Sequence, residues 1–105
     1  MRMLVLGAGL QGSACAYDLL QNPDVKVVRL ADLHTGHLPQ FLAPHSGERL
    51  IFTPLDVRDK EAVLALMRES DAVKSAIPYY FNYELAALAE EAGVHFSDLG
   101  GNTEI

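Results

Sequence analysis

The feature that most constrains the fold of this chain is a short apolar run that ends in a glycine-rich turn. Met3-Leu4-Val5-Leu6 contains no polar residue, which is typical of a strand buried on both faces of a parallel sheet. Gly7-Ala8-Gly9-Leu10-Gln11-Gly12 follows directly and matches the pattern G-x-G-x-x-G. Apolar side chains then recur at helical spacing over Leu10–Leu20, which predicts a helix. A strand, a glycine turn and a helix in this order indicate the first unit of an alternating α/β fold.

The remainder of the chain continues this alternation. Further strands are predicted over 25–31, 49–53, 72–77 and 94–97, and helices over 59–69 and 82–92, with Asp59 and Asn82 as N-caps and Gly93 as a left-handed C-terminal residue. The stretch 33–47 is predicted to be a loop with one short helix. Strict alternation requires right-handed crossovers, so we expect a doubly wound, Rossmann-like parallel sheet of five strands in the order 3-2-1-4-5.

Length and charge limit the classes of function. The 105 residues suffice for one globular domain, spanning 1–105. Eight Lys and Arg against fourteen Asp and Glu give a net charge of −6 without a basic run, which argues against nucleic acid and anionic membranes as partners. The sequence contains no apolar span of the length that a membrane helix needs. A lone cysteine, Cys15, suits a reducing compartment, so a cytoplasmic location is expected.

The glycine motif has the residues that a bound pyrophosphate requires. Gly7 permits a tight turn, Gly9 lets an anion approach the backbone, and Gly12 lets the helix and strand pack closely. The free N–H groups and the dipole of the helix N-terminus attract the anion. A glycine-rich turn without a ligand is the alternative. The predicted strand before the motif and the helix after it favour a dinucleotide.

An acidic residue further along indicates which dinucleotide binds. Asp32 ends the second predicted strand, 20 residues after Gly12, where a carboxylate accepts hydrogen bonds from an adenosine ribose. Leu33 and His34 offer no guanidinium for a 2′-phosphate, and Asp32 would repel that phosphate. We therefore expect NAD as the cofactor rather than NADP. A solvated aspartate at a strand end is the alternative.

Two segments in the second half carry a more specific signal. Ser-Ala-Ile-Pro-Tyr-Tyr at 75–80 leaves the fourth predicted strand, and His-Phe-Ser-Asp-Leu-Gly-Gly-Asn at 95–102 leaves the fifth. With the segments 7–17 and 55–57, they make the chain resemble the nucleotide-binding domain of the saccharopine dehydrogenase family, which includes lysine dehydrogenases. The resemblance extends over nearly all of the chain and is loosest at 33–48.

The resemblance implies a set of cofactor contacts. Gly7, Gly9, Leu10, Gln11 and Gly12 would lie at the pyrophosphate, Asp32 at the adenosine ribose, Asp56 with Val57 beside the adenine, Ser75, Ala76 and Pro78 toward the nicotinamide ribose, and Leu99, Gly100 and Gly101 near the nicotinamide. It assigns no catalytic residue within this chain. It also implies a second, substrate-binding domain, so the chain is expected to be a fragment of a longer two-domain enzyme.

The implied activity is that of an NAD(P)-dependent dehydrogenase acting on CH–NH or CH–NH2 donors. Hydride would pass between a C–N carbon of a small amino-acid substrate and the nicotinamide, in lysine metabolism, and the isolated chain would be inactive. Exposed apolar surface where the second domain docks would favour a homo-oligomer. Two alternatives remain open: a regulatory module that senses NAD without turnover, and a carboxynorspermidine-type reductase domain that uses NADPH.

Several other residues have less specific patterns. Lys74 lies inside the fourth predicted strand, where a buried ammonium costs several kcal/mol. We expect it to reach the edge of the sheet or to weaken the fold, and a catalytic lysine is the alternative. No metal site is expected, because no nearby ligand completes a set with His34 and His37. Packing is expected for Cys15 and a structural hydrogen bond for His95 with Asp98, whereas the aromatic residues at 79–83 either line a pocket or support the second domain.

Overall fold

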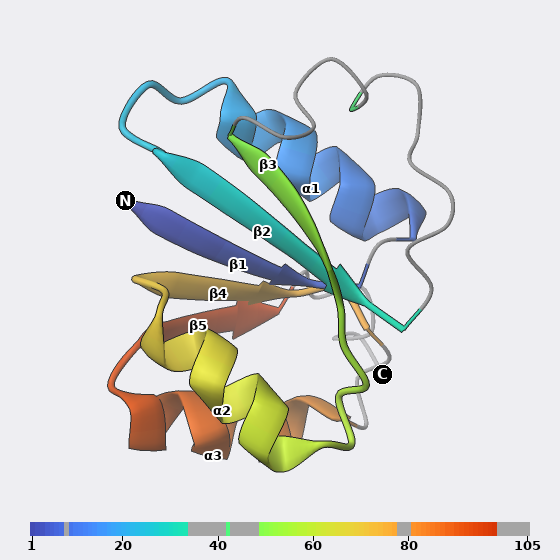
Figure 1. Ribbon diagram of the computed structural model, residues 1–105, viewed down its shortest axis with the longest axis vertical. Coiled ribbons are helices and arrows are strands. Elements are labelled where there is room, and N and C mark those ends of the chain that lie inside the picture. Colours follow the sequence, from blue (N-terminus) through green and yellow to red (C-terminus); the bar gives the residue numbers. More distant parts are fainter. Residues whose placement is uncertain (8, 34–41, 43–48, 78–80, 99–105) are drawn as a thin grey trace.

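Five parallel strands form one sheet with the first strand at its centre. A computed structural model of the protein describes residues 1–7, 9–33, 42, 49–77 and 81–98. The strands are β1 (Arg2–Leu6), β2 (Val27–Asp32), β3 (Leu50–Pro54), β4 (Ala72–Ser75) and β5 (His95–Asp98). They lie in the order β3-β2-β1-β4-β5, and every neighbouring pair is parallel (Figure 1). This confirms the predicted doubly wound, Rossmann-like sheet.

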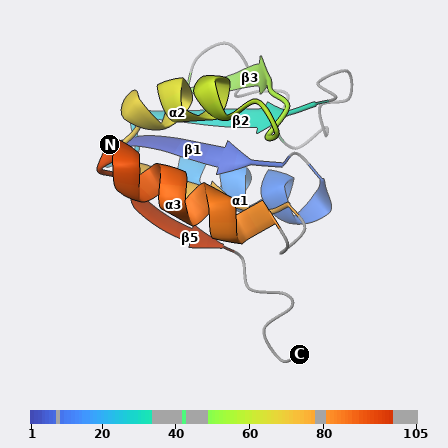
Figure 2. The same cartoon turned by 90° about the horizontal axis from the view of Figure 1, so that it is seen from below.

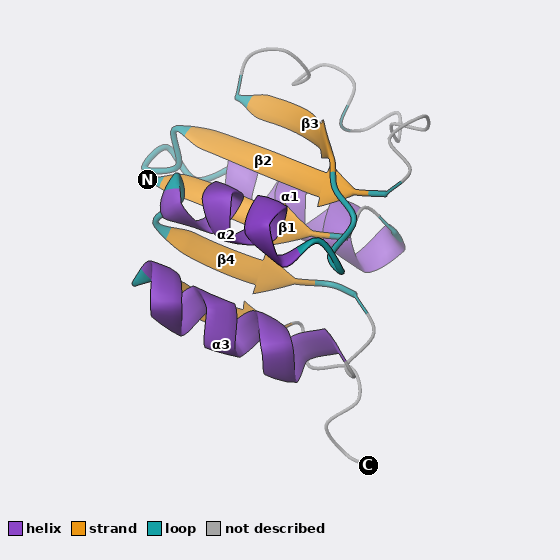
Figure 3. Ribbon diagram, turned by 60° about the horizontal axis from the view of Figure 1, so that its bottom comes forward, coloured by secondary structure: helices purple, strands orange, loops and turns teal. Residues whose placement is uncertain are grey.

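Helices cover both faces of the sheet. Helix α1 (Leu10–Leu20) lies on one face, and α2 (Lys60–Arg68) and α3 (Asn82–Ala92) lie on the other (Figures 2 and 3). This arrangement follows from right-handed crossovers that run in opposite directions along the sheet, from β1 to β2 through α1, and from β3 to β4 and β4 to β5 through α2 and α3. None of the helices in the described ranges is long and apolar enough to span a membrane.

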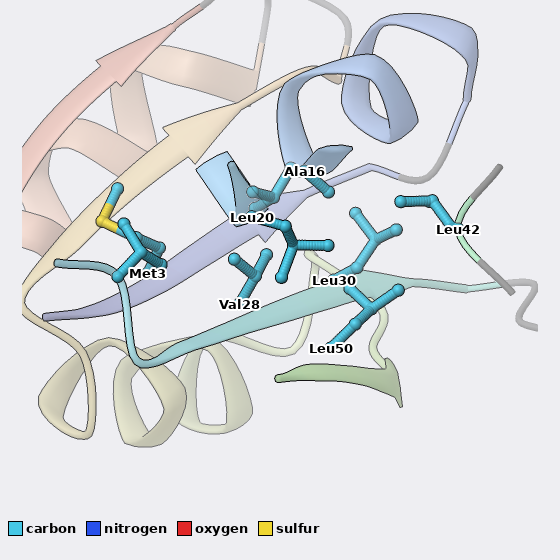
Figure 4. Packing of buried hydrophobic residues seen from close by; sticks show 9 residues of the cluster. Met3, Ala16, Leu20, Val28, Leu30, Leu42 and Leu50 are labelled. Atoms are coloured by element: carbon cyan, nitrogen blue, oxygen red, sulfur yellow. The ribbon is translucent and has the colours of Figure 1, made fainter. Parts of the chain in front are cut away.

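The apolar residues of β1 divide between two cores. Met3 and Val5 pack with α1 and β2, in the cluster shown in Figure 4, whereas Leu4 and Leu6 pack with α2 and α3. All four side chains are at most 4% exposed. Each such burial contributes about 1.5–3 kcal/mol to folding. The unbroken run at 3–6 therefore marks a strand covered on both faces, as the sequence predicted.

Several predicted strand boundaries are wrong by one or two residues. β2 begins at Val27 rather than at residue 25, and β3 at Leu50 rather than at residue 49. β4 ends at Ser75, and not at residue 77, because its partner β1 ends at Leu6 where the chain turns into the glycine loop. β5 begins at His95 because the Val94 N–H still donates to the Ala89 carbonyl at the end of α3.

The helix ends follow the predicted caps with one exception. The Asp59 carboxylate accepts the Ala62 N–H at 3.2 Å and caps α2, and Gly93 ends α3 with φ of 76°. Asn82 was predicted to cap α3, which is wrong: Phe81 is the N-cap residue and Asn82 is the first residue of the helix. The Asn82 side chain instead bonds to the ends of β4 and β5. The predicted loop and helix at 33–47 lie outside the described residues, apart from Leu33 and Leu42.

Candidate functional site

The glycine loop connects the end of β1 to α1. Gly7 has φ of +99° and donates its N–H to the Ala31 carbonyl of β2 at 2.7 Å. A Cβ at Gly7 would lie 2.8 Å from Ile77 Cγ2 and 3.1 Å from the Ala76 carbonyl oxygen. Glycine is thus required here by its positive φ and by the closeness of the segment after β4. The predicted tight turn at Gly7 is present.

The other two glycines of the motif have contrasting surroundings. A Cβ at Gly12 would overlap the Gly7 carbonyl oxygen and would lie 3.3 Å from Ala76 Cβ. Around Gly9, by contrast, a Cβ would meet no atom within 4 Å. Gly12 therefore lets α1 pack against the loop, whereas Gly9 leaves open space beside the backbone.

The open side of the loop fits a pyrophosphate. Gly9 is the N-cap residue of α1, with no hydrogen bond from a capping side chain. The N–H groups of a first helical turn lack intrahelical partners, and they carry a partial positive charge that favours an anion. The residues predicted for the pyrophosphate (Gly7, Gly9, Leu10, Gln11 and Gly12) all lie in this loop and first turn.

A cavity of about 400 Å³ extends from the glycine loop across the ends of β2 and β3. It brings together Gly7 and the residues predicted for the adenosine, which are Asp32, Asp56 and Val57. Ile77 and Phe81, from the segment after β4, line it as well. Residues far apart in the sequence thus meet at the carboxyl edge of the sheet, where ligands of doubly wound folds bind.

Asp32 lies at the point of this cavity where an adenosine ribose is expected. It is half-buried at the end of β2, and its backbone carbonyl accepts the Leu55 N–H at 2.8 Å. This bond holds the segment after β3 beside Asp32. Asp32 and Asp56 consequently line one cavity.

Arg58 also lines the cavity, and the sequence interpretation missed it. Its side chain donates from Nε to Asp56 Oδ1 at 3.0 Å and from Nη2 to Asp56 Oδ2 at 2.8 Å, and its backbone N–H donates to Asp56 Oδ1 at 2.9 Å. These bonds from Arg58 lower the pKa of the Asp56 carboxyl to about 2. Leu33 and His34, which follow Asp32 directly, carry no guanidinium. The end of the neighbouring strand, where Leu-Asp-Val-Arg occupies 55–58, was the signal that could have found Arg58.

The residues predicted for the nicotinamide side are described only in part. Ser75 is buried, and its hydroxyl donates to Asn82 Oδ1 at 2.6 Å, while Asn82 Nδ2 donates to Asp98 Oδ2 at 3.3 Å. Ala76 lies against the glycine loop and donates its N–H to the Leu6 carbonyl at 2.7 Å. Ser75 and Ala76 thus lie beside the loop. Pro78, Leu99, Gly100 and Gly101 lie outside the described residues.

Lys74 is not the fully buried ammonium that a central strand would produce. Its side chain is half-buried, and Nζ donates to Ser97 Oγ on β5 at 3.0 Å.

Partial burial raises the pKa of the Cys15 thiol, and the charge of Lys74 offsets part of that rise. The thiol is therefore held in its neutral form, which favours packing over reactivity.

His95, Asp98 and the described aromatic residues of the segment 79–83 do not form one site. The predicted hydrogen bond between His95 and Asp98 is wrong. Asp98 accepts a hydrogen bond from Asn82, and it lies three residues from His95 along β5, which places the two side chains on opposite faces. Of the aromatic residues at 79–83, Phe81 lines the cavity beside Asp32, whereas Tyr83 is 88% exposed on α3. Within the ranges that the structure describes, no group of three or more His, Cys, Asp or Glu is placed to hold a metal.

Comparison with known proteins agrees with this fold. The family model for the saccharopine dehydrogenase NADP binding domain matches residues 3–105. Saccharopine dehydrogenase (L-Glu forming) from Saccharomyces cerevisiae, in its apo form, has a similar structure, with 27% sequence identity and a TM-score of 0.76. That similarity covers 92% of this chain and 21% of the yeast enzyme, so the chain spans about a fifth of that enzyme's length.

Two further solved structures share the fold. A UDP-glucose-4-epimerase from Stenotrophomonas maltophila, with bound NAD, is 23% identical with a TM-score of 0.73, over 93% of this chain and 36% of that one. A mutated uronate dehydrogenase is 25% identical with a TM-score of 0.63, over 89% of this chain and 36% of that one.

Proposed function

Because this chain belongs to the saccharopine dehydrogenase NADP-binding domain family, we propose that it holds the nicotinamide cofactor of an amino-acid oxidoreductase. The observation that carries this proposal is the cavity that joins the glycine loop to Asp32 and Asp56. The reaction would transfer hydride between the nicotinamide and a C–N carbon of the substrate. The cofactor supplies that chemistry, and this domain binds and orients it.

We propose NAD as the preferred cofactor, although the family is described by NADP. Asp32 lines the cavity at the end of β2, and a carboxylate at this position of the fold accepts hydrogen bonds from a ribose diol and repels a 2′-phosphate. Arg58, a guanidinium on the same cavity, is already paired with Asp56. Arg58 is also the observation that favours the alternative, a reductase domain that uses NADPH.

Thermal unfolding of the purified protein with each dinucleotide tests this preference. NAD at 100 times its Kd should stabilise the fold by about 2.7 kcal/mol, which raises the melting temperature by roughly 10–20 °C for a domain of this size. NADP at the same concentration should give a smaller rise, and Asp32→Ala should narrow the difference. Equal rises for both dinucleotides in the unaltered protein would overturn the proposed role of Asp32.

The substrate site is proposed to lie in another part of a longer enzyme. The chain spans about a fifth of the yeast saccharopine dehydrogenase, and the residues proposed for the adenosine half of the cofactor line its cavity. We propose an amino-acid substrate, a place in lysine metabolism, a cytoplasmic location and self-association. An assay of NADH formation with lysine and with saccharopine tests the activity. Turnover by the longer enzyme, but not by residues 1–105 alone, supports this arrangement. Binding of NAD without turnover by either protein favours a sensing module.

A further inference from the structure

We propose that the pair formed by Asp56 and Arg58 sets the cofactor preference: by holding the guanidinium, Asp56 keeps it from the 2′-phosphate of NADP. This inference rests on the proposed function, since it concerns the same dinucleotide site. It assigns a role in specificity to two residues after β3, in addition to the aspartate at the end of β2.

The geometry of the pair occupies the guanidinium. Arg58 donates to both carboxylate oxygens of Asp56, at 3.0 Å from Nε and 2.8 Å from Nη2. The two residues are also tied through the Arg58 backbone N–H, at 2.9 Å. A bidentate guanidinium–carboxylate pair uses the same paired donors that would bind a phosphate. While the pair is formed, the Nε–H and the Nη2–H that it uses cannot also bind a 2′-phosphate.

The position of the pair gives it access to that phosphate. Pro54, the last residue of β3, is in register with Asp32, and the Leu55 N–H donates to the Asp32 carbonyl at 2.8 Å. The segment that carries the pair therefore begins beside the residue expected to hold the adenosine ribose. The Arg58 side chain is 72% exposed, so its guanidinium is free to reorient once Asp56 is removed.

The charges that line the cavity also affect the preference between NAD and NADP. Its charged lining residues, among those that the structure describes, are Asp32, Asp56 and Arg58. With Arg58 paired to Asp56, the formal charges of Asp32, Asp56 and Arg58 sum to −1, which favours a ribose diol over a phosphate. The pKa of Asp56 is held at about 2 by its hydrogen bonds from Arg58, so the pair persists at neutral pH. Loss of the Asp56 charge would leave Arg58 available as a phosphate ligand.

The test is the ratio of the dissociation constants of NADP and NAD, measured by calorimetry on the purified protein and its variants. We expect Asp56→Asn to lower this ratio by about tenfold, since one charge-assisted hydrogen bond has about that effect. Any general weakening at the adenine affects both dinucleotides and cancels in the ratio. Adding Arg58→Ala to Asp56→Asn should restore the original ratio, whereas adding Arg58→Lys should restore it only in part.

Asp71→Asn is the matched control. Asp71 pairs with Arg2 through Nε at 3.4 Å and Nη2 at 3.3 Å, at the opposite end of the sheet, and its loss should leave the ratio unchanged. The inference is overturned if Asp56→Asn leaves the ratio unchanged, or if Arg58→Ala has no effect in the Asp56→Asn background. Failure of the proposed function looks different, because the unaltered protein and all variants would then bind neither dinucleotide.

Discussion

Adding one methyl group at Gly12 or at Gly9 separates the structural role of the glycine loop from its role toward a ligand. At Gly12 the new Cβ would overlap the Gly7 carbonyl oxygen, which is backbone and cannot turn aside. At Gly9 the new Cβ meets no atom within 4 Å, and the φ of −69° there is one that alanine adopts. We therefore expect Gly12→Ala to weaken the fold and Gly9→Ala to weaken binding.

The magnitudes follow from opposing terms. Alanine at Gly12 gains about 1 kcal/mol of helix propensity, but overpacking costs about 1–3 kcal/mol and more where the backbone must move. Because the overlapped atom belongs to the backbone, the cost lies at or above the upper end of that range, and a net loss of about 2 kcal/mol or more is expected, which lowers the melting temperature by roughly 8–16 °C or more. For Gly9→Ala, a small loss at the N-cap is offset by about 0.4–1 kcal/mol from the reduced freedom of the unfolded chain. Its melting temperature should change by only a few degrees.

Thermal unfolding by circular dichroism and NAD titration by calorimetry give the two readouts. Gly9→Ala should keep its melting temperature and lose NAD affinity by about tenfold or more, because the methyl group fills the space that the pyrophosphate approaches. Gly93→Ala is the control, since its φ of +76° strains an alanine without touching the loop. The reasoning is refuted if Gly12→Ala has the same melting temperature as the unaltered protein, or if Gly9→Ala binds NAD with unchanged affinity.

Two other perturbations test the polar contacts. Asn82→Ala should lower the free energy of unfolding by about 1–3 kcal/mol, because the buried Ser75 hydroxyl loses its acceptor. Adding Ser75→Ala to this variant should recover much of the loss, as measured by urea unfolding. Losses of the two single variants that simply add in the double variant would contradict this. The pKa values of Asp56 and Asp71 are lowered by hydrogen bonds from Arg58 and Arg2, that of Asp56 to about 2. The contribution of each pair to stability is therefore present above about pH 4 and is lost as the pH falls through the lowered pKa. Between pH 5 and pH 2.5 the melting temperature should therefore fall further for the unaltered protein than for the double variant Asp56→Asn and Asp71→Asn, and equal falls would show that neither pair contributes.

Much of the fold could be predicted because its signals are local. The apolar run at 3–6 requires burial on both faces of a strand, and the Gly7–Gly12 motif requires backbone freedom. Both requirements follow from the residue types alone. The order of the strands then followed from alternation and from the handedness of crossovers. The meeting of Asp32 and Asp56 in one cavity agrees with the same topology.

The errors arose where a contact across the sheet decides the outcome. Asn82 has a residue type suited to an N-cap, but its side chain bonds to Ser75 and Asp98, which are near it only in the folded chain. Arg58 lies far from Asp32 in the sequence and beside it in the cavity. For Lys74 the partner could not be predicted, because its hydrogen bond to Ser97 on the edge strand β5 depends on the register of β4 with β5.

The central position of β1 has a consequence for synthesis on the ribosome. β1 is the first strand to be made, yet its pairing partner β4 comes about 70 residues later in the chain. At a synthesis rate of about 5–20 residues per second, the edge of β1 that pairs with β4 has no partner strand for roughly 4–14 s. During that interval Leu4 and Leu6 lack the α3 residues that later cover them. The nascent chain therefore presents an apolar strand with an open edge, which is the kind of segment that chaperones bind and that aggregates when they do not.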